Sequence, residues 1–206
     1  MRRGRRDTLQ LPPRQPLRGE AKLRAAIEHF AIAVGGRVAL DVGAAAGGFT
    51  RVLLSAGAAR VYAVDAGHGQ LLGSLRQDER VVNLEATNVA ALDTTLVPET
   101  IDVVTIDVSY ISLATTLTQL DRVRFAADAD LVALVKPMFE LRLATAPVDA
   151  ATVNAAADRA ATAIDAAGWS VCGRLRSPVT GARGAHEVLL HARRGPSHPG
   201  LERSEP

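Results

Sequence analysis

Two residues of opposite charge, Asp107 and Lys136, each come at the end of an apolar stretch, in "IDVVTIDVS" and in "DLVALVKP". A buried charge is costly unless it is paired and hydrogen-bonded. If these stretches are neighbouring parallel strands, the two charges meet at one edge of the sheet and can pair there. The pair is then either a structural ion pair or part of a reaction site, and its place at the carboxyl ends of strands favours a reaction site.

A loop of small residues follows another apolar stretch and is suited to binding a nucleotide. It runs from Asp41 to Thr50 as "DVGAAAGGFT", and its small side chains let the backbone approach a ligand closely. Asp65 stands about 20 positions beyond the loop, where nucleotide-binding α/β folds hold ribose hydroxyls. The pattern therefore favours a nucleotide-type ligand over a purely structural turn.

The same loop departs from the dinucleotide fingerprint G-x-G-x-x-G. The middle glycine of that fingerprint lets the backbone touch a pyrophosphate, and the corresponding residue here is Ala45. S-adenosylmethionine has a ribose and an adenine but no pyrophosphate, and the negative charge of Asp41 suits its cationic methionine end. We therefore favour S-adenosylmethionine over a nicotinamide or flavin dinucleotide, and rank an oxidoreductase last.

These residues are positioned by strands that alternate with helices. Five β-branched runs predict strands near residues 37–43, 59–67, 80–88, 101–109 and 130–137. Helical spacing predicts helices at 19–34, 50–56, 69–77, 112–125 and 150–167, with a weak one at 88–93. Residues 169–174 and 187–192 read as two final strands without a connecting helix, which must pair antiparallel. The sequence predicts a Rossmann-like, doubly wound α/β fold with a mostly parallel seven-stranded sheet and an antiparallel last strand.

Length and composition indicate one domain, which we place at residues 19–194 of the 206, with disordered flanks at 1–18 and 195–206. No apolar stretch has the length of a membrane span or of a signal peptide, so we expect a cytoplasmic protein. The single cysteine, Cys172, is expected to be a buried strand residue. Arginines crowd the first 18 residues and basic side chains recur near the end, which suggests a polyanionic partner or a solvated tail.

Eight segments together resemble the TlyA (hemolysin A) family of S-adenosylmethionine-dependent ribosomal RNA 2′-O-methyltransferases, within the FtsJ-like group. The segments span residues 18–192 and are "RGEAKL", "LDVGAAAGGFT", "VYAVDAGHGQL", "LRQDERV", "TN" at 87–88, "IDVSYISL", "LVALVKPMFE" and "GARGAHEVLLH". The resemblance implies the class I methyltransferase fold. It also implies methylation of the 2′-hydroxyl of a cytidine in ribosomal RNA, with ribosomal RNA or ribosomal subunits as partner and neither DNA nor a membrane.

The resemblance also assigns site residues. The family uses a Lys-Asp-Lys-Glu set, which falls on Lys22, Asp107, Lys136 and Glu187. We expect no metal site. By pattern alone, Lys22 and Glu187 are ordinary surface residue types. The residues implied to bind the cofactor are Asp41, Gly43, Ala44, Gly47, Gly48, Phe49, Asp65, Thr87, Asn88 and Asp107.

In this reading Lys136 either takes the proton of the ribose hydroxyl or stays charged and stabilises the oxyanion that forms. Asp107 would orient Lys136, and Glu187 would orient Lys22. The family typically has a small RNA-binding domain ahead of the catalytic domain, whereas about twenty residues precede Lys22 here. Two alternatives therefore stay open, an O-methyltransferase of a small hydroxylated molecule and an inactive RNA-binding module.

Overall fold

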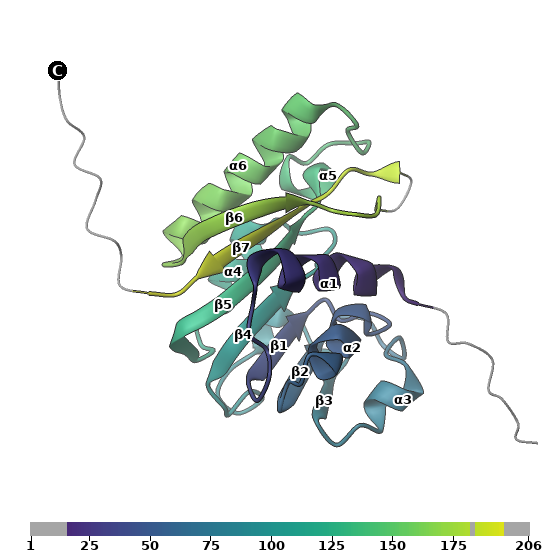
Figure 1. Ribbon diagram of the computed structural model, residues 1–206, viewed down its shortest axis with the longest axis vertical. Coiled ribbons are helices and arrows are strands. Elements are labelled where there is room, and N and C mark those ends of the chain that lie inside the picture. The colour runs from purple at the N-terminus through teal and green to yellow at the C-terminus, as the bar shows by residue number, and fades with distance from the viewer. Residues whose placement is uncertain (1–15, 182–183, 196–206) are drawn as a thin grey trace, which may run out of the picture.

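The computed structural model describes residues 16–181 and 184–195, which build one seven-stranded sheet (Figure 1). The strands lie in the order β3-β2-β1-β4-β5-β7-β6. The first five run parallel, and β7 is antiparallel to both of its neighbours, β5 and β6. The strands are β1 (Val38–Val42), β2 (Arg60–Val64), β3 (Val81–Leu84), β4 (Ile101–Ile106), β5 (Phe125–Val135), β6 (Ser170–Arg176) and β7 (Val188–Arg193). The predicted seven-stranded sheet with an antiparallel last strand is confirmed.

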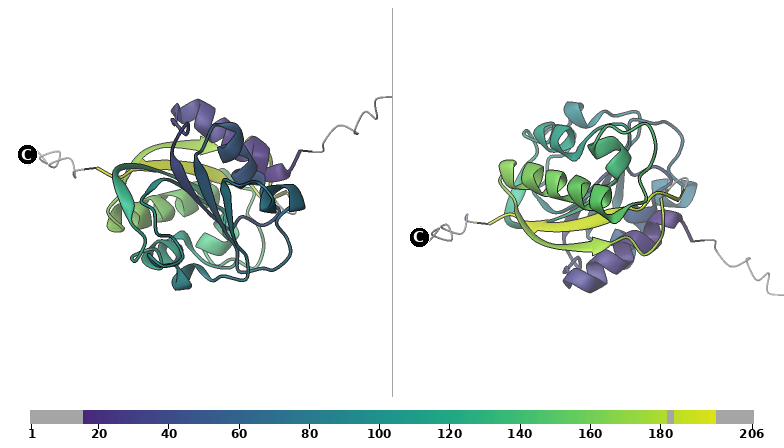
Figure 2. Two further views of the ribbon diagram at one scale, coloured as in Figure 1. Left: turned by 90° about the horizontal axis from the view of Figure 1, so that it is seen from below. Right: turned by 90° about the horizontal axis from the view of Figure 1, so that it is seen from above.

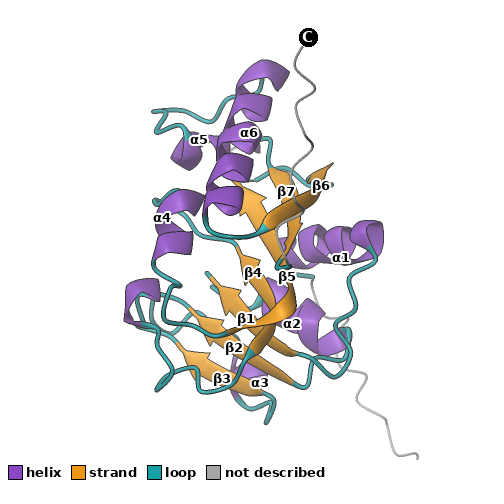
Figure 3. Ribbon diagram, turned by 90° about the vertical axis from the view of Figure 1, so that its left-hand side faces the viewer, coloured by secondary structure: helices purple, strands orange, loops and turns teal. Residues whose placement is uncertain are grey.

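Helices cover both faces of the sheet (Figures 2 and 3). One face packs against α1 (Arg18–Phe30), α2 (Gly48–Ser55) and α3 (Gly73–Arg76). The other packs against α4 (Leu113–Thr118), α5 (Pro137–Glu140), α6 (Ala150–Ala166) and the 3-10 turn η1 (Val89–Ala91). The chain therefore forms three layers, with an apolar core on each side of the sheet.

Strand side chains alternate between these two cores, as the two-residue period of a strand requires. In β1, Ala39 packs toward α1 and α2, whereas Leu40 and Val42 pack toward α4 and α6. Every one of these side chains is almost fully buried. A strand that is buried on both faces must be apolar along its length, which is why the runs used for prediction were visible in the sequence.

Several predicted boundaries are wrong. The helix expected at 112–125 ends at Thr118, and Phe125 already begins β5. The pairing of β4 with β5 is irregular there, because Ile101 pairs with Phe125 while Val103 pairs with Asp130. The alanine- and aspartate-rich residues 126–129 between them have no strand periodicity, so the start of the strand was not visible. The helix expected at 69–77 is reduced to α3, and the one at 88–93 is the turn η1.

The remaining expectations concern exposure and the chain ends. Cys172 is exposed on β6, which is an edge strand, so its predicted burial is wrong. The arginine-rich residues 1–15 and the tail at 196–206 lie outside the described residues, whereas Arg18 begins α1. Among the helices that the structure describes, none combines the length and the apolar character that a membrane span requires.

Candidate active site

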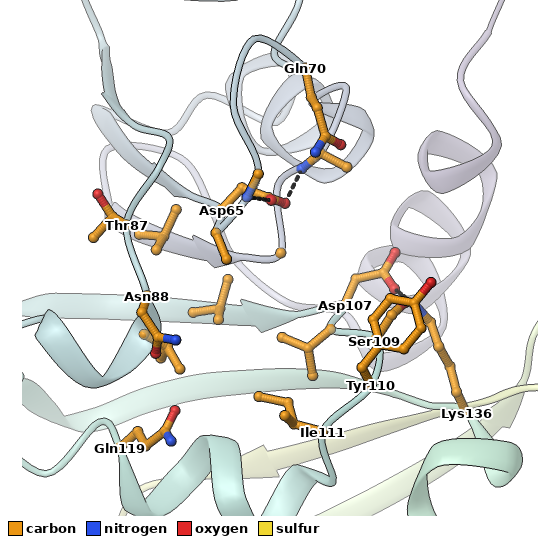
Figure 4. Close-up of a pocket in the computed structure, with 18 residues that line it drawn as sticks. Asp65, Gln70, Thr87, Asn88, Asp107, Ser109, Tyr110, Ile111, Gln119 and Lys136 are labelled. Carbon is orange, nitrogen blue, oxygen red and sulfur yellow. Dashed lines mark hydrogen bonds and ion pairs between the residues drawn. The ribbon is translucent and has the colours of Figure 1, made fainter. Parts of the chain in front are cut away.

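The carboxyl ends of the parallel strands enclose a cavity beside the point where strand order reverses. The reversal lies at β1, which pairs with β2 on one side and β4 on the other, and ligands of doubly wound folds bind at such points. The cavity has a volume of about 610 Å³ (Figure 4). Its lining residues are Val42, Gly43, Ala45, Val64, Asp65, Ala66, Gly67, Gln70, Thr87, Asn88, Val89, Asp107, Val108, Ser109, Tyr110, Ile111, Gln119 and Lys136.

Asp65 follows β2 directly and joins two loops of this cavity. Its Oδ2 accepts a hydrogen bond from the backbone N–H of Ala45 (2.8 Å), and its Oδ1 accepts one from Gly67 (2.7 Å). Ala45 has a left-handed backbone with φ 45°, so an alanine adopts here a conformation that glycine usually provides. Each carboxylate oxygen keeps acceptor capacity for a ligand hydroxyl.

Gly43 brings the ends of β1 and β4 into contact. It has φ 88°, and a Cβ atom on it would lie 2.4 Å from the carbonyl oxygen of Asp107. The N–H of Asp107 in turn donates to the carbonyl of Val42 (2.8 Å). Only glycine fits this position without displacing the backbone of Asp107.

Asp41 is fully buried beneath the loop, and it does not line the cavity. Its Oδ2 accepts a hydrogen bond from the Thr50 hydroxyl (2.6 Å) and its Oδ1 accepts one from the Thr105 hydroxyl (2.9 Å). Burial raises the pKa of Asp41 to about 6, although the two hydroxyls act in the opposite direction. The carboxylate thus fastens the start of α2 to β4 instead of reaching toward a ligand.

The other loop residues assigned to the cofactor also lie behind the cavity wall. A Cβ atom on Gly47 would meet the side chain of Leu75 in α3, and one on Gly48 would lie 3.1 Å from the Cα of Gly19 in α1. Ala44 and Phe49 are buried in the same core. Of the loop residues assigned to the cofactor, only Gly43 is brought to the cavity itself.

Thr87 and Asn88 come after β3 and form another part of the wall of this cavity. The N–H of Thr87 donates to the backbone carbonyl of Asp65 (3.0 Å), which ties the ends of β2 and β3 together. Asn88 caps the turn η1, because its Oδ1 accepts a hydrogen bond from the N–H of Ala90 (2.9 Å). Both residues therefore line the cavity from a well-anchored segment.

Asp107 and Lys136 meet at the other end of the cavity, as expected for neighbouring strand ends. Lys136 Nζ lies 2.6 Å from Asp107 Oδ1 and donates a hydrogen bond to Ser109 Oγ (3.0 Å). The two charged side chains are about a fifth exposed, so both are accessible to a ligand. Pro137 occupies the first position of α5 and ends β5 just past the lysine.

A second ion pair lies nearby and is buried. Lys22 Nζ of α1 donates to Glu187 Oε2 at 2.5 Å, and the two side chains are 6% and 4% exposed. A second cavity of about 750 Å³ is lined by both ion pairs, together with residues of α5 and of the segment that follows it. It shares Asp107, Ser109, Tyr110 and Lys136 with the first cavity. The structure thus brings all four residues of the Lys-Asp-Lys-Glu set to the lining of this second cavity.

Sequence reasoning missed several polar residues of these cavities, among them Ser109, Tyr110 and Gln119. Ser109 was detectable, because it stands two residues after Asp107 in the same segment. Tyr110 is 88% exposed with φ 73°, and nothing in the sequence pattern marks that conformation.

The sequence contained one further signal for Lys22. The chain has only two lysines among its 24 lysine and arginine residues, and both lysines line the second cavity.

The fold and the cavity define a class I S-adenosylmethionine-dependent methyltransferase. The model of the FtsJ-like methyltransferase family matches residues 17–194, so the chain belongs to that family. The residues present fit this cofactor: Gly43 lines the cavity with backbone alone, Asp65 offers acceptors for ribose hydroxyls, and apolar side chains such as Ile111 can flank a base.

The chain is similar to curated and solved proteins over most of its described length. It is 45% identical over 185 residues to the 16S/23S rRNA (cytidine-2′-O)-methyltransferase TlyA of Mycobacterium tuberculosis, which covers 85% of this chain and 67% of that protein. It is 35% identical to Hemolysin A of Brachyspira hyodysenteriae, over 84% of this chain and 75% of that protein. A crystal structure of a protein from Lactococcus lactis has 33% identity and a TM-score of 0.81, over 86% of this chain and 88% of that one.

Proposed function

We propose that the protein transfers a methyl group from S-adenosylmethionine to the 2′-hydroxyl of a cytidine in ribosomal RNA, in the cytoplasm. The observation that supports this most directly is the shared wall of the two cavities. Lys136 and Asp107 line both the cavity that fits the cofactor and the neighbouring cavity, where Lys22 and Glu187 complete the set. The similarity to a ribosomal RNA cytidine methyltransferase supports the choice of acceptor.

Methyl transfer requires an acceptor oxygen in line with the methyl carbon and its leaving group. S-adenosylmethionine supplies the methyl group on a positively charged sulfur. The second cavity would hold the acceptor so that its hydroxyl reaches the shared wall, where Lys136 Nζ is accessible. Holding both reactants at this wall supplies much of the rate enhancement.

We assign to Lys136 the direct contact with the acceptor hydroxyl. Asp107 and Ser109 fix the position of its Nζ at 2.6 Å and 3.0 Å. A lysine can give up its proton in a protein site, whereas an arginine cannot. Because the chain uses arginine at 22 of its 24 basic positions, a lysine at this wall supports a role in proton transfer over a role as a fixed charge.

Lys22 and Glu187 are positioning residues in this proposal. Their buried bond fixes α1 against the chain just before β7 and places a positive charge at the edge of the second cavity.

The test uses ribosomal subunits from a cell that lacks this protein, labelled S-adenosylmethionine and mapping of the methylated ribose. We expect Lys136→Ala to bind S-adenosylhomocysteine within a few-fold of the unmodified protein while methyl transfer is lost. Lys136→Arg keeps the positive charge, but an arginine does not give up its proton and so cannot act as a base. This variant should therefore be inactive as well. Arg76→Ala, an exposed basic residue outside both cavities, is the control.

Three results would contradict parts of the proposal. Activity of Lys136→Ala would remove the residue from the mechanism. Activity of Lys136→Arg with inactivity of the alanine variant would make the residue a fixed charge that stabilises the oxyanion. Labelling of small phenols or sugars, with no labelling of ribosomal subunits, would make the acceptor a small molecule.

A further inference from the structure

Gln119 places a buried, unpaired acceptor in the wall of the cofactor cavity. It follows the last residue of α4 and lines the cavity near Asn88 and Ile111 (Figure 4). Its Oε1 is inaccessible to solvent and accepts no hydrogen bond from any residue that the structure describes. A buried acceptor without a partner costs free energy. A ligand donor that hydrogen-bonds to this atom removes that cost, so the bond contributes more to binding than a bond to an exposed acceptor would.

The position of Gln119 is well defined by the helix before it. Its backbone N–H donates to the carbonyl of Thr116 (3.1 Å). At the start of α4, the Ser112 hydroxyl accepts from the N–H of Thr115, and Glu140 Oε2 accepts from the N–H of Leu113 (2.9 Å). The glutamine amide is therefore presented to the cavity by an element that is anchored at both ends.

The arrangement of the cavity indicates which part of the cofactor lies beside this amide. In the function proposed above, on which this step rests, the methyl group lies at the Lys136 end of the cavity, and Asp65 offers acceptors for the ribose. Gln119 lies on the opposite side of the cavity from Lys136, as Figure 4 shows. The group beyond the ribose is the adenine, so the base lies at the Gln119 end.

The chemistry of the amide matches the edge of adenine. Adenine presents an amino donor beside a ring-nitrogen acceptor, and a glutamine amide offers an acceptor beside a donor. Asn88 also lies at this end, but its Oδ1 is already occupied by the N–H of Ala90. Gln119 Oε1 is the side-chain amide oxygen at this end that accepts no hydrogen bond from any described residue, whereas Asn88 Oδ1 has one of its two lone pairs in use.

We propose that Gln119 determines specificity for the adenine base, with Oε1 accepting from the exocyclic amino group and Nε2 donating to the adjacent ring nitrogen. The inference concerns the cofactor and does not depend on the identity of the methyl acceptor. A base that lacks the amino group leaves Oε1 buried and unpaired, and it should bind more weakly.

The test is calorimetric binding without RNA, using S-adenosylhomocysteine and an analogue that has hydrogen in place of the adenine amino group. We expect the unmodified protein to bind the analogue roughly tenfold more weakly, which is the loss of about one buried hydrogen bond. Gln119→Met, which has similar length but no hydrogen-bonding group, should bind S-adenosylhomocysteine roughly tenfold more weakly and should not distinguish the two ligands. Gln77→Met is the matched control, because Gln77 follows the last residue of α3 in the same way, is exposed and lies outside both cavities.

The comparison of two ligands separates recognition from a general effect on the cavity. If Gln119→Met weakens both ligands by the same factor, or weakens neither, the inference is overturned. If the variant does not give a cooperative melting transition, the unmodified protein decides alone, and equal affinity for the two ligands overturns the inference. Failure of the ribosomal RNA proposal would be seen in the methylation assay, not in these RNA-free measurements.

Discussion

The buried pair of Lys22 and Glu187 gives a prediction in which stability and activity can be separated. In Lys22→Met the unbranched side chain is one atom shorter and loses its charge, so Glu187 is left buried without its cation. Removing one partner of a buried ion pair costs about 3 to 5 kcal/mol. Because both residues line a cavity of about 750 Å³ that water can enter, we expect the lower end, about 3 kcal/mol.

Glu187→Gln should cost a similar amount, since it leaves Lys22 charged and buried. The double variant Lys22→Met/Glu187→Gln removes both charges and leaves the shape almost unchanged, so its free energy of unfolding should lie within about 1 kcal/mol of the unmodified protein. In a domain of this size each single variant should melt roughly 6 to 12 °C lower.

The assay is urea unfolding followed by the fluorescence of the single tryptophan, Trp169, which is 5% exposed and reports on the core. Single-variant losses below about 1 kcal/mol, or losses that simply add in the double variant, would refute the coupling argument. If the double variant is stable and still inactive, the charges serve the reaction and not only the fold.

Two further predictions concern the loop after β1. Asp41 has a pKa of about 6 in the folded protein against 3.8 ordinarily, so between these pH values the folded state holds a proton that the unfolded state has lost. The free energy of unfolding should therefore fall by about 2 kcal/mol as the pH rises from about 4 to 7. Asp41→Asn should remove that dependence, and urea unfolding at both pH values checks it; an unchanged pH dependence would contradict it. Gly43→Ala should weaken S-adenosylhomocysteine binding at least tenfold in calorimetry, because its Cβ would displace Asp107, whereas Gly73→Ala, with open space around it, should have no effect. Normal binding by Gly43→Ala would show that the loop yields without affecting the site.

The architecture was predictable because the parallel strands are apolar along their length. Runs of that kind end visibly, so the residues just past them, Asp65, Asp107 and Lys136, could be assigned to one edge of the sheet without a structure. The same pattern does not show side-chain direction, and Asp41 was therefore expected at the ligand although it points into the core.

The contact of Lys22 with Glu187 could not be predicted from periodicity. The two residues are 165 positions apart, and their meeting depends on α1 packing beside β7. Only the family resemblance suggested the pair, although the scarcity of lysine was a signal within the sequence itself. The unpaired oxygen of Gln119 is likewise a property of three-dimensional packing, which no local pattern records.

The place of β7 between β5 and β6 has a consequence for the order in which the site forms during synthesis. The cofactor cavity uses residues 42–136, so its lining is complete while the last third of the chain is still to be made. Among the described strands, β6 is hydrogen-bonded only to β7. Lys22 cannot form its ion pair until Glu187 has been added to the chain. A growing chain therefore gains the means to hold the cofactor well before it can complete the second cavity, and it exposes the edge of β5 in the interval.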